Sequence, residues 1–262
     1  MRENNLLTSC KITWCPGCSN FGILQATKEA ILELEKRGTK RENIVFCAGI
    51  GCHGKILDYL NINSFYGLHG RAIPLAQGIK VANPDLKVIC FVGDGDIYNE
   101  GLDHLLHAAK RNADITVVVH DNRNFALTVS QFTATSPKGF VGSSTPQGST
   151  EEPFNPLALV FSANATFLAR GYALKVEHLK NLMVEAVLHE GFSFLEVLQP
   201  CITFFDQRDF YEKSIYEIKI PKTKKEAWEK ITEWNYENGK EMAKIPIGIF
   251  WKEKKPVFNS NE

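Results

Sequence analysis

The 262-residue sequence has no excess of charge of either sign and no long hydrophobic run. Lysine plus arginine and aspartate plus glutamate both number 30, so the charge balance favours neither nucleic acid nor a membrane surface as a partner. No apolar stretch approaches the roughly 20 residues that span a bilayer, and the N-terminus lacks the apolar region of a signal peptide. We find no internal repeat. We therefore expect a cytoplasmic protein with no nucleic-acid partner and no membrane partner.

Apolar patterning predicts strands that alternate with helices. Strands are expected at 44–47, 87–92, 115–119, 166–169 and 193–197, and helices at 21–36, 72–81, 100–111, 155–162 and 176–189. This alternation predicts an α/β fold with a mostly parallel sheet and helices on both faces. We place one domain at 1–201. Residues 202–262 are more aromatic and charged, with an amphipathic helix at 222–234, and we expect a C-terminal extension that lies over the domain or along a partner.

Two successive predicted strands end in residues suited to a divalent cation. Gly93-Asp94-Gly95-Asp96 follows the strand at 87–92, and Asn122 follows the next strand. A strand-helix-strand unit brings two such carboxyl ends together, at the edge where open α/β sheets bind ligands. Asp94 and Asn122 can therefore face one ion, although Gly-Asp-Gly alone is an ordinary turn about as often.

Two further glycine-rich loops are expected at this edge. One contains Gly51 and follows the strand at 44–47, and the other contains His69-Gly70-Arg71 and precedes the helix at 72–81. Backbone N–H groups at such a helix start, with His69 and Arg71, suit a diphosphate or a carboxylate. The alternative is that His69 satisfies a turn and Arg71 a helix end. The long polar segment 128–153 is typical of a functional or partner-contacting loop.

Seven cysteines in a cytosolic protein of this size indicate metal or redox chemistry more than disulfides. Two of them, Cys47 and Cys90, lie within apolar strands and are expected in the core. Four lie in Gly- or Pro-bearing loops and could together bind zinc or an iron–sulfur cluster: Cys15, Cys18, Cys52 and Cys201. A rival grouping is the C-x₄-C-x₂-C run of Cys10, Cys15 and Cys18, which is like that of plant-type two-iron ferredoxins.

In combination these features resemble the β subunit of the 2-oxoacid:ferredoxin oxidoreductases, the pyruvate and 2-oxoglutarate synthase group. The matching motifs, in order, are WCPGC, GIGC, LHGRAIPLAQGIK, NPDL, GDGD, HDN, NPLAL, QPC and IGIFWKEKKP. The resemblance covers nearly the whole chain and implies a thiamine diphosphate-binding fold. It implies that Cys15, Cys18, Cys52 and Cys201 hold one 4Fe–4S cluster. It also implies that Asp94, Asn122 and the carbonyl of Asn124 hold Mg²⁺ on thiamine diphosphate.

The residues expected to contact the thiamine cofactor follow from these motifs. We assign Lys55 and Leu127 as catalytic candidates, Lys55 as a cation near the substrate carboxylate, with an exposed, solvated lysine as the alternative. The chain departs from the family pattern after GDGD and at 125–131, in the loop over the cofactor, which leaves the 2-oxoacid open. The cofactor-binding candidates are Gly51, His69, Gly70, Gly93, Asp94, Gly95, Asp96, Asn122, Asn124, Leu127 and Thr128.

The resemblance implies oxidative decarboxylation of a 2-oxoacid, in which the thiamine cofactor acts as electron sink, the cluster passes electrons to ferredoxin and coenzyme A takes the acyl group. A glutamate that activates the cofactor is expected from an α subunit with a pyrimidine-binding domain, possibly fused to a γ subunit. We therefore expect an obligate heteromer. Two alternatives stay open: a thiamine-dependent non-oxidative decarboxylase or transketolase-like subunit with structural zinc, and a non-catalytic electron-transfer module with a two-iron cluster.

Overall fold

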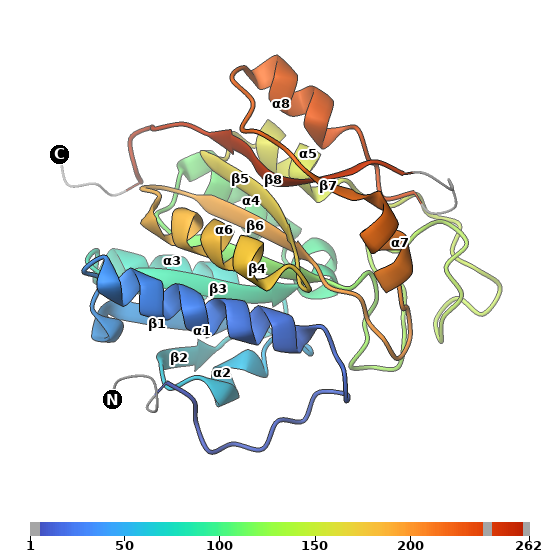
Figure 1. The fold of residues 1–262 in the computed structure, drawn as a ribbon, viewed down its shortest axis with the longest axis horizontal. Helices are drawn as coiled ribbons and strands as arrows, with labels where there is room; N and C mark the ends of the chain where they lie inside the picture. The colour runs from blue at the N-terminus through green and yellow to red at the C-terminus, as the bar shows by residue number, and fades with distance from the viewer. Residues whose placement is uncertain (1–5, 238–242, 259–262) are drawn as a thin grey trace.

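The computed structural model describes residues 6–237 and 243–258. One eight-stranded sheet forms the centre, in the order β2-β1-β3-β4-β6-β5-β8-β7 (Figure 1). All neighbouring strands are parallel except β5 and β8, which confirms the predicted mostly parallel α/β sheet. The strands are β1 (Ile44–Ala48), β2 (Asn63–Tyr66), β3 (Lys87–Gly93), β4 (Thr116–Asp121), β5 (Phe167–Tyr172), β6 (Ser193–Leu198), β7 (Ile215–Glu217) and β8 (Ile245–Lys252).

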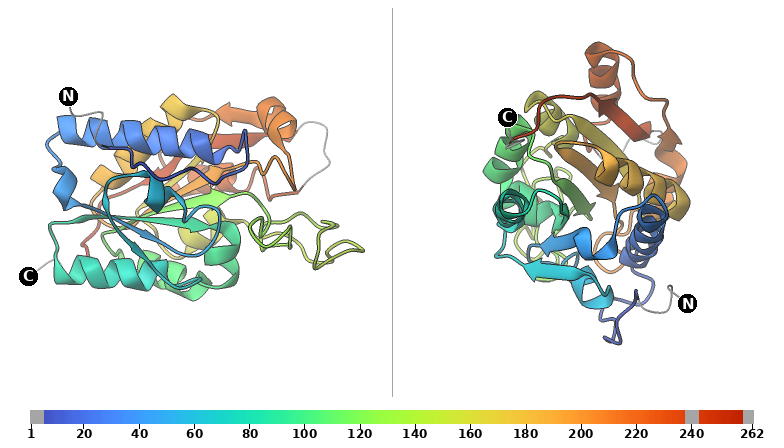
Figure 2. Two further views of the ribbon diagram at one scale, coloured as in Figure 1. Left: turned by 90° about the horizontal axis from the view of Figure 1, so that it is seen from below. Right: turned by 90° about the vertical axis from the view of Figure 1, so that its left-hand side faces the viewer.

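Helices cover both faces of this sheet, as predicted (Figure 2). Alternate residues of a strand point to opposite faces, so Phe46 packs in one apolar cluster with α1 and α6, and Cys47 packs in another with α3, α4 and α5. The bounds are α1 (Asn20–Lys36), α3 (Ala72–Ala82), α4 (Leu102–Arg111), α5 (Pro156–Ser162) and α6 (Val176–Leu188).

The residues after Cys201 do more than cover the domain, because β8 pairs with β5 and β7 inside the main sheet. The helix expected at 222–234 is present as α8 (Lys224–Ile231), and a short helix, α7 (Arg208–Ser214), precedes β7. Neither strand of this segment was predicted. Their pairing partners lie far away in the sequence, and local patterning does not report such contacts.

Other short elements were also missed. Strand β2 has all of its residues exposed, so it lacks the apolar run that marks a buried strand. The short helix α2 (Ile56–Tyr59) precedes it. One π-helical turn, Gly95–Asn99, precedes α4, which therefore begins at Leu102 and not at about 100. Among the described residues, no helix has both the length and the apolar character needed to cross a bilayer.

Candidate functional site

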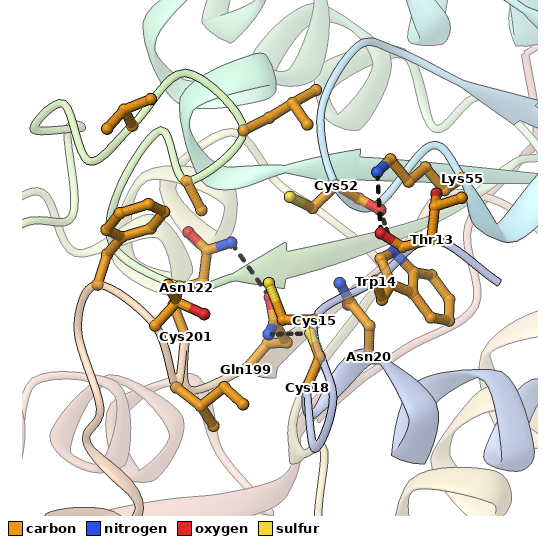
Figure 3. A pocket seen from close by; sticks show the side chains of 16 residues that line it. Thr13, Trp14, Cys15, Cys18, Asn20, Cys52, Lys55, Asn122, Gln199 and Cys201 are labelled. Carbon is orange, nitrogen blue, oxygen red and sulfur yellow. Dashed lines mark hydrogen bonds between the residues drawn. The ribbon is translucent and has the colours of Figure 1, made fainter.

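The carboxyl ends of β1, β2, β3, β4 and β6 point to one edge of the sheet, because these strands are parallel. The loops that follow them line two cavities. The first, which we call the carboxylate cavity, has a volume of about 140 Å³ and is lined by Asp94 and Asp96. The second, the thiol cavity, has a volume of about 280 Å³ and is lined by Cys15, Cys18, Cys52 and Cys201 (Figure 3).

Asp94 lies buried directly after β3. Its Oδ2 accepts hydrogen bonds from Thr133 Oγ1 at 2.6 Å and Thr135 Oγ1 at 3.3 Å. Burial raises the pKa of Asp94 to about 6, although these hydroxyls and the backbone N–H of Asn122 favour the charged form. Strands β3 and β4 are parallel neighbours with Gly93 opposite His120, so their carboxyl ends meet, as the strand-helix-strand spacing predicts. Asp94 therefore offers a carboxylate that the protein already holds in place.

The turn after β4 presents oxygen atoms to the same cavity. Asn122 Oδ1 accepts from the backbone N–H of Asn124 at 3.2 Å, and Asn124 Nδ2 donates to the Asn122 carbonyl at 2.8 Å. Arg123 between them has a positive φ of 61°. The Asn124 carbonyl accepts from Ala126 N–H at 2.9 Å, which leaves one lone pair for another partner. Asn124 Oδ1 is buried and has no hydrogen-bond partner among the residues that the structure describes.

Asp96 joins three of the loops. Its Oδ1 accepts from the backbone N–H of Gly70 at 2.7 Å and of Ile50 at 3.3 Å. His53 Nε2 lies 3.4 Å from Oδ2, and His69 Nε2 lies 3.5 Å from Oδ1. Burial alone would raise the pKa of Asp96, but these histidines and the Gly70 N–H lower it overall. Asp96 thus holds the rim of the carboxylate cavity together.

Glycine is needed where this rim is tightest. A Cβ on Gly95 would lie 2.2 Å from a ring carbon of Phe125, and one on Gly93 would lie 2.6 Å from His53 Nδ1. All but one of the predicted cofactor-binding residues line the carboxylate cavity: Gly51, His69, Gly93, Asp94, Gly95, Asp96, Asn122, Asn124, Leu127 and Thr128. The exception is Gly70, whose backbone N–H donates to Asp96, a residue that lines the cavity.

The four loop cysteines predicted to act together do surround one cavity, although they come from three segments of the chain. Burial raises the pKa of Cys52 to about 11; Lys55 lowers it, and the nearby sulfurs of Cys18, Cys201 and Cys15 raise it. The pKa of Cys18 is also raised, again mainly by burial. Among the described residues, no three His, Cys, Asp or Glu side chains are close enough for a single metal ion. The thiols instead border a space larger than one ion.

The other cysteines lie elsewhere. Cys10 is exposed and is not part of the cavity lining. Cys47 and Cys90 are fully buried opposite each other on β1 and β3, where the sequence predicts core residues. Lys55 lines the thiol cavity, and its Nζ donates to the Thr13 carbonyl at 3.4 Å. It is thus on the cysteine side of the site, away from Asp94.

Sequence reasoning missed several polar residues of the site. His53 follows Cys52 in a glycine-rich loop, a signal that would have identified it. Thr133 and Thr135 lie in the long polar segment, where nothing local distinguishes them from the neighbouring serines and threonines. Gln199 lies in the QPC motif, where the neighbouring cysteine is the only residue that the pattern marks as a ligand.

The two cavities adjoin, because Cys52, Asn122, Ala126 and Leu127 line both. A buried carboxylate and an amide at neighbouring strand ends of this fold are the arrangement that the sequence resemblance implies for a domain of the thiamine-dependent enzymes. In agreement, the family described as "Thiamine pyrophosphate enzyme, C-terminal TPP binding domain" matches residues 49–197.

Relatives give a narrower assignment. The chain is 42% identical over 256 residues to the 2-oxoacid:ferredoxin oxidoreductase subunit beta of Sulfolobus sp, covering 91% of this chain and 81% of that one. It is 39% identical over 190 residues to the 2-oxoglutarate synthase subunit KorB of Archaeoglobus fulgidus, covering 72% and 70%. The chain therefore belongs to the 2-oxoacid:ferredoxin oxidoreductase β-subunit family, as its motifs predicted.

A solved structure agrees with this assignment. The 2-oxoglutarate:ferredoxin oxidoreductase from Magnetococcus marinus, with 2-oxoglutarate, coenzyme A and succinyl-CoA bound, is 32% identical to this chain. It matches with a TM-score of 0.91 over 100% of this chain and 88% of that one. The predicted fold is confirmed.

Proposed function

We propose that this chain binds Mg²⁺ and thiamine diphosphate in the carboxylate cavity and a 4Fe–4S cluster in the thiol cavity. With a partner subunit it catalyses the oxidative decarboxylation of a 2-oxoacid with coenzyme A and passes the electrons to ferredoxin. The observation that supports this most is the shared wall between the cavities, formed by Cys52, Asn122, Ala126 and Leu127. Adjacent sites give electrons a short path from one group to the other.

The donor set of the carboxylate cavity fits Mg²⁺. Asp94 supplies a carboxylate, Asn122 an amide oxygen and Asn124 a carbonyl, all hard oxygen ligands of the kind that Mg²⁺ shares with cofactor phosphates. Thr133 and Thr135 both donate to Oδ2 of Asp94, so neither hydroxyl occupies Oδ1. The buried Asn124 Oδ1 without a partner among the described residues is a further polar atom for a ligand to satisfy.

His69 and Gly70 are suited to the diphosphate end of the cofactor. They precede α3, where backbone N–H groups and the helix dipole favour an anion. Asp96 fixes both residues, since it accepts from Gly70 N–H and contacts His69. Asp96 therefore acts on the cofactor through the loops that it holds.

The thiol cavity fits a cluster better than a single ion. Four thiols surround a volume of about 280 Å³, and a cluster of four irons needs its sulfur ligands spread around such a space. The raised pKa values of Cys18 and Cys52 mean that both thiols release protons when they bind metal. Structural zinc would instead require the four sulfurs to close around one ion.

When bound, thiamine diphosphate supplies the electron sink for loss of CO₂. The chain's own residues orient and shield it. Leu127 lines both cavities with a side chain that is 49% exposed, so it offers an apolar surface to a group bound there. Lys55 provides a cation on the thiol side for an anionic group of substrate or coenzyme A. The glutamate that activates the aminopyrimidine comes from the α subunit, so the chain is inactive alone.

The test is to purify the chain anaerobically with its partner subunit and to assay viologen reduction. Pyruvate, 2-oxoglutarate and a branched-chain 2-oxoacid are each tested with and without coenzyme A. We expect coenzyme A-dependent reduction with at least one acid. The names of the relatives include 2-oxoacid and 2-oxoglutarate enzymes, so the active acid also distinguishes between them. No reduction with any acid would contradict the proposed function.

A further inference from the structure

Gln199 lies between the two cavities and contacts a residue of each. It follows β6 and is only 1% exposed. Its Oε1 accepts a hydrogen bond from Asn122 Nδ2 at 3.1 Å, and its Nε2 donates to Cys18 Sγ at 3.9 Å. Figure 3 shows both contacts as dashed lines that meet at Gln199. One side chain thus links the amide next to Asp94 with one of the four thiols.

The orientation of this amide follows from its other neighbours. Gln199 Nε2 also lies 3.2 Å from the carbonyl of Pro200 and 3.0 Å from Ser19 Oγ, so its two hydrogens are shared among three acceptors, of which Cys18 Sγ at 3.9 Å is the farthest. A carbonyl oxygen can only accept, so the atom that faces it must be the amide nitrogen. The oxygen of Gln199 therefore faces Asn122. Asn122 must in turn present its own nitrogen to Gln199. Asn122 Oδ1, which accepts from the Asn124 N–H at 3.2 Å, keeps one lone pair for the carboxylate cavity.

The sheet brings these residues together. Strands β4 and β6 are parallel neighbours with Asp121 opposite Leu198, and Gln199 N–H donates to the Asp121 carbonyl at 2.8 Å. The next residues along the two strands, Asn122 and Gln199, are consequently adjacent. Ser19 Oγ donates to the Pro200 carbonyl at 2.5 Å and holds the loop that contains Cys18 against the end of β6. The contacts of Gln199 with Asn122 and Cys18 therefore follow from the fold itself.

We propose that Gln199 is a positioning residue that couples the two sites: it turns the oxygen of Asn122 toward Mg²⁺ and thiamine diphosphate, and it donates an N–H···S hydrogen bond to the cluster ligand Cys18. This inference rests on the proposed function. A hydrogen bond to a cluster sulfur favours the more negative, reduced cluster and so raises its reduction potential. A partner that orients a metal ligand raises metal affinity, and its loss costs about 10- to 100-fold.

Replacement by methionine tests both effects. Gln199→Met keeps much of the side-chain volume but removes the donor and the acceptor. In the anaerobically purified complex we expect the affinity for thiamine diphosphate with Mg²⁺ to fall about 10-fold or more. We also expect the midpoint potential of the cluster, measured by EPR-monitored redox titration, to fall by the equivalent of a tenfold change in equilibrium constant, about 59 mV for one electron.

A second variant separates coupling from simple damage to the fold. Gln199→Glu still accepts from Asn122, so we expect cofactor affinity within about twofold of the unchanged protein. Its carboxyl group lacks the amide N–H donors that face Cys18, so the cluster potential should fall as in Gln199→Met, by about 59 mV for one electron. The matched controls are Gln25→Met and Gln25→Glu on the exposed face of α1, where Gln25 contacts Glu29. They should change neither quantity.

The outcomes distinguish the inference from the proposed function. If the unchanged complex contains no iron, the cluster assignment fails, and the proposed coupling role of Gln199 fails with it. If the cluster is present and both Gln199 variants show the affinity and the potential of the Gln25 controls, the cluster assignment stands and the coupling role of Gln199 is overturned.

Discussion

The two cavities at the carboxyl edge are stabilised in different ways. In the carboxylate cavity, Asp94 and Asp96 each accept hydrogen bonds from hydroxyls or backbone N–H groups of the protein. In the thiol cavity, burial raises the pKa values of Cys18 and Cys52, so these groups are protonated thiols until a metal binds. The carboxylate cavity is thus organised by the chain itself, whereas under the proposed function the thiol cavity would be completed by the cluster.

The largest effect is expected from loss of one thiol. Cys201→Ser removes a sulfur that lines the thiol cavity only. Iron and sulfide content should fall nearly to zero, because the cluster needs all four thiolates. Affinity for thiamine diphosphate with Mg²⁺, measured by titration calorimetry, should stay within about threefold, because the hydrogen bonds of Asp94 are untouched.

Cys10→Ser is the matched control for that change. Cys10 is exposed and lies outside the thiol-cavity lining, so iron content and the EPR spectrum should not change. Loss of the cluster spectrum in Cys10→Ser would instead support the two-iron grouping of Cys10, Cys15 and Cys18.

The reverse experiment alters the carboxylate cavity alone. Asp94→Asn removes the negative charge at the proposed Mg²⁺ site but keeps the shape of the side chain. We expect the affinity for thiamine diphosphate with Mg²⁺ to fall at least about 100-fold, while the iron content stays that of the unchanged protein. Loss of iron in this variant would show that the two cavities do not form independently.

A smaller effect is expected from a residue that contacts Asp94 and not the proposed ion. Thr133→Val removes the hydroxyl that donates to Asp94 Oδ2 at 2.6 Å, and the affinity should fall about tenfold because the carboxylate loses an orienting partner. Thr145→Val is the control, since Thr145 makes a similar bond in the same segment, to the Phe140 carbonyl at 2.9 Å. Equal affinities for the two variants would mean that the chain does not preorganise Asp94.

The sequence was most informative where local patterns determine structure. The β-branched runs of β3 and β4 identify buried strands, and the helix between them brings Asp94 and Asn122 to one edge. Their meeting could therefore be predicted. The convergence of the cysteines was open from spacing alone, because their loops come from segments whose positions depend on the strand order.

Contacts between distant segments could not be predicted. Strand β8 pairs with β5 across more than 70 residues of chain, and the hydroxyl of Thr133 reaches Asp94 from a loop without periodicity. Gln199 is a similar case, since its role depends on the β4–β6 register. Each of these features is fixed by tertiary packing, which single-sequence patterns do not encode.

The most direct test of the two-site account is EPR spectroscopy of the anaerobically purified complex during turnover. The active 2-oxoacid and coenzyme A are added without any other reductant. The account predicts about four irons and four sulfides per chain and a reduced-cluster signal that appears with substrate and is absent in Asp94→Asn. Zinc in place of iron, or acyl-CoA formation while the cluster stays oxidised, would contradict it.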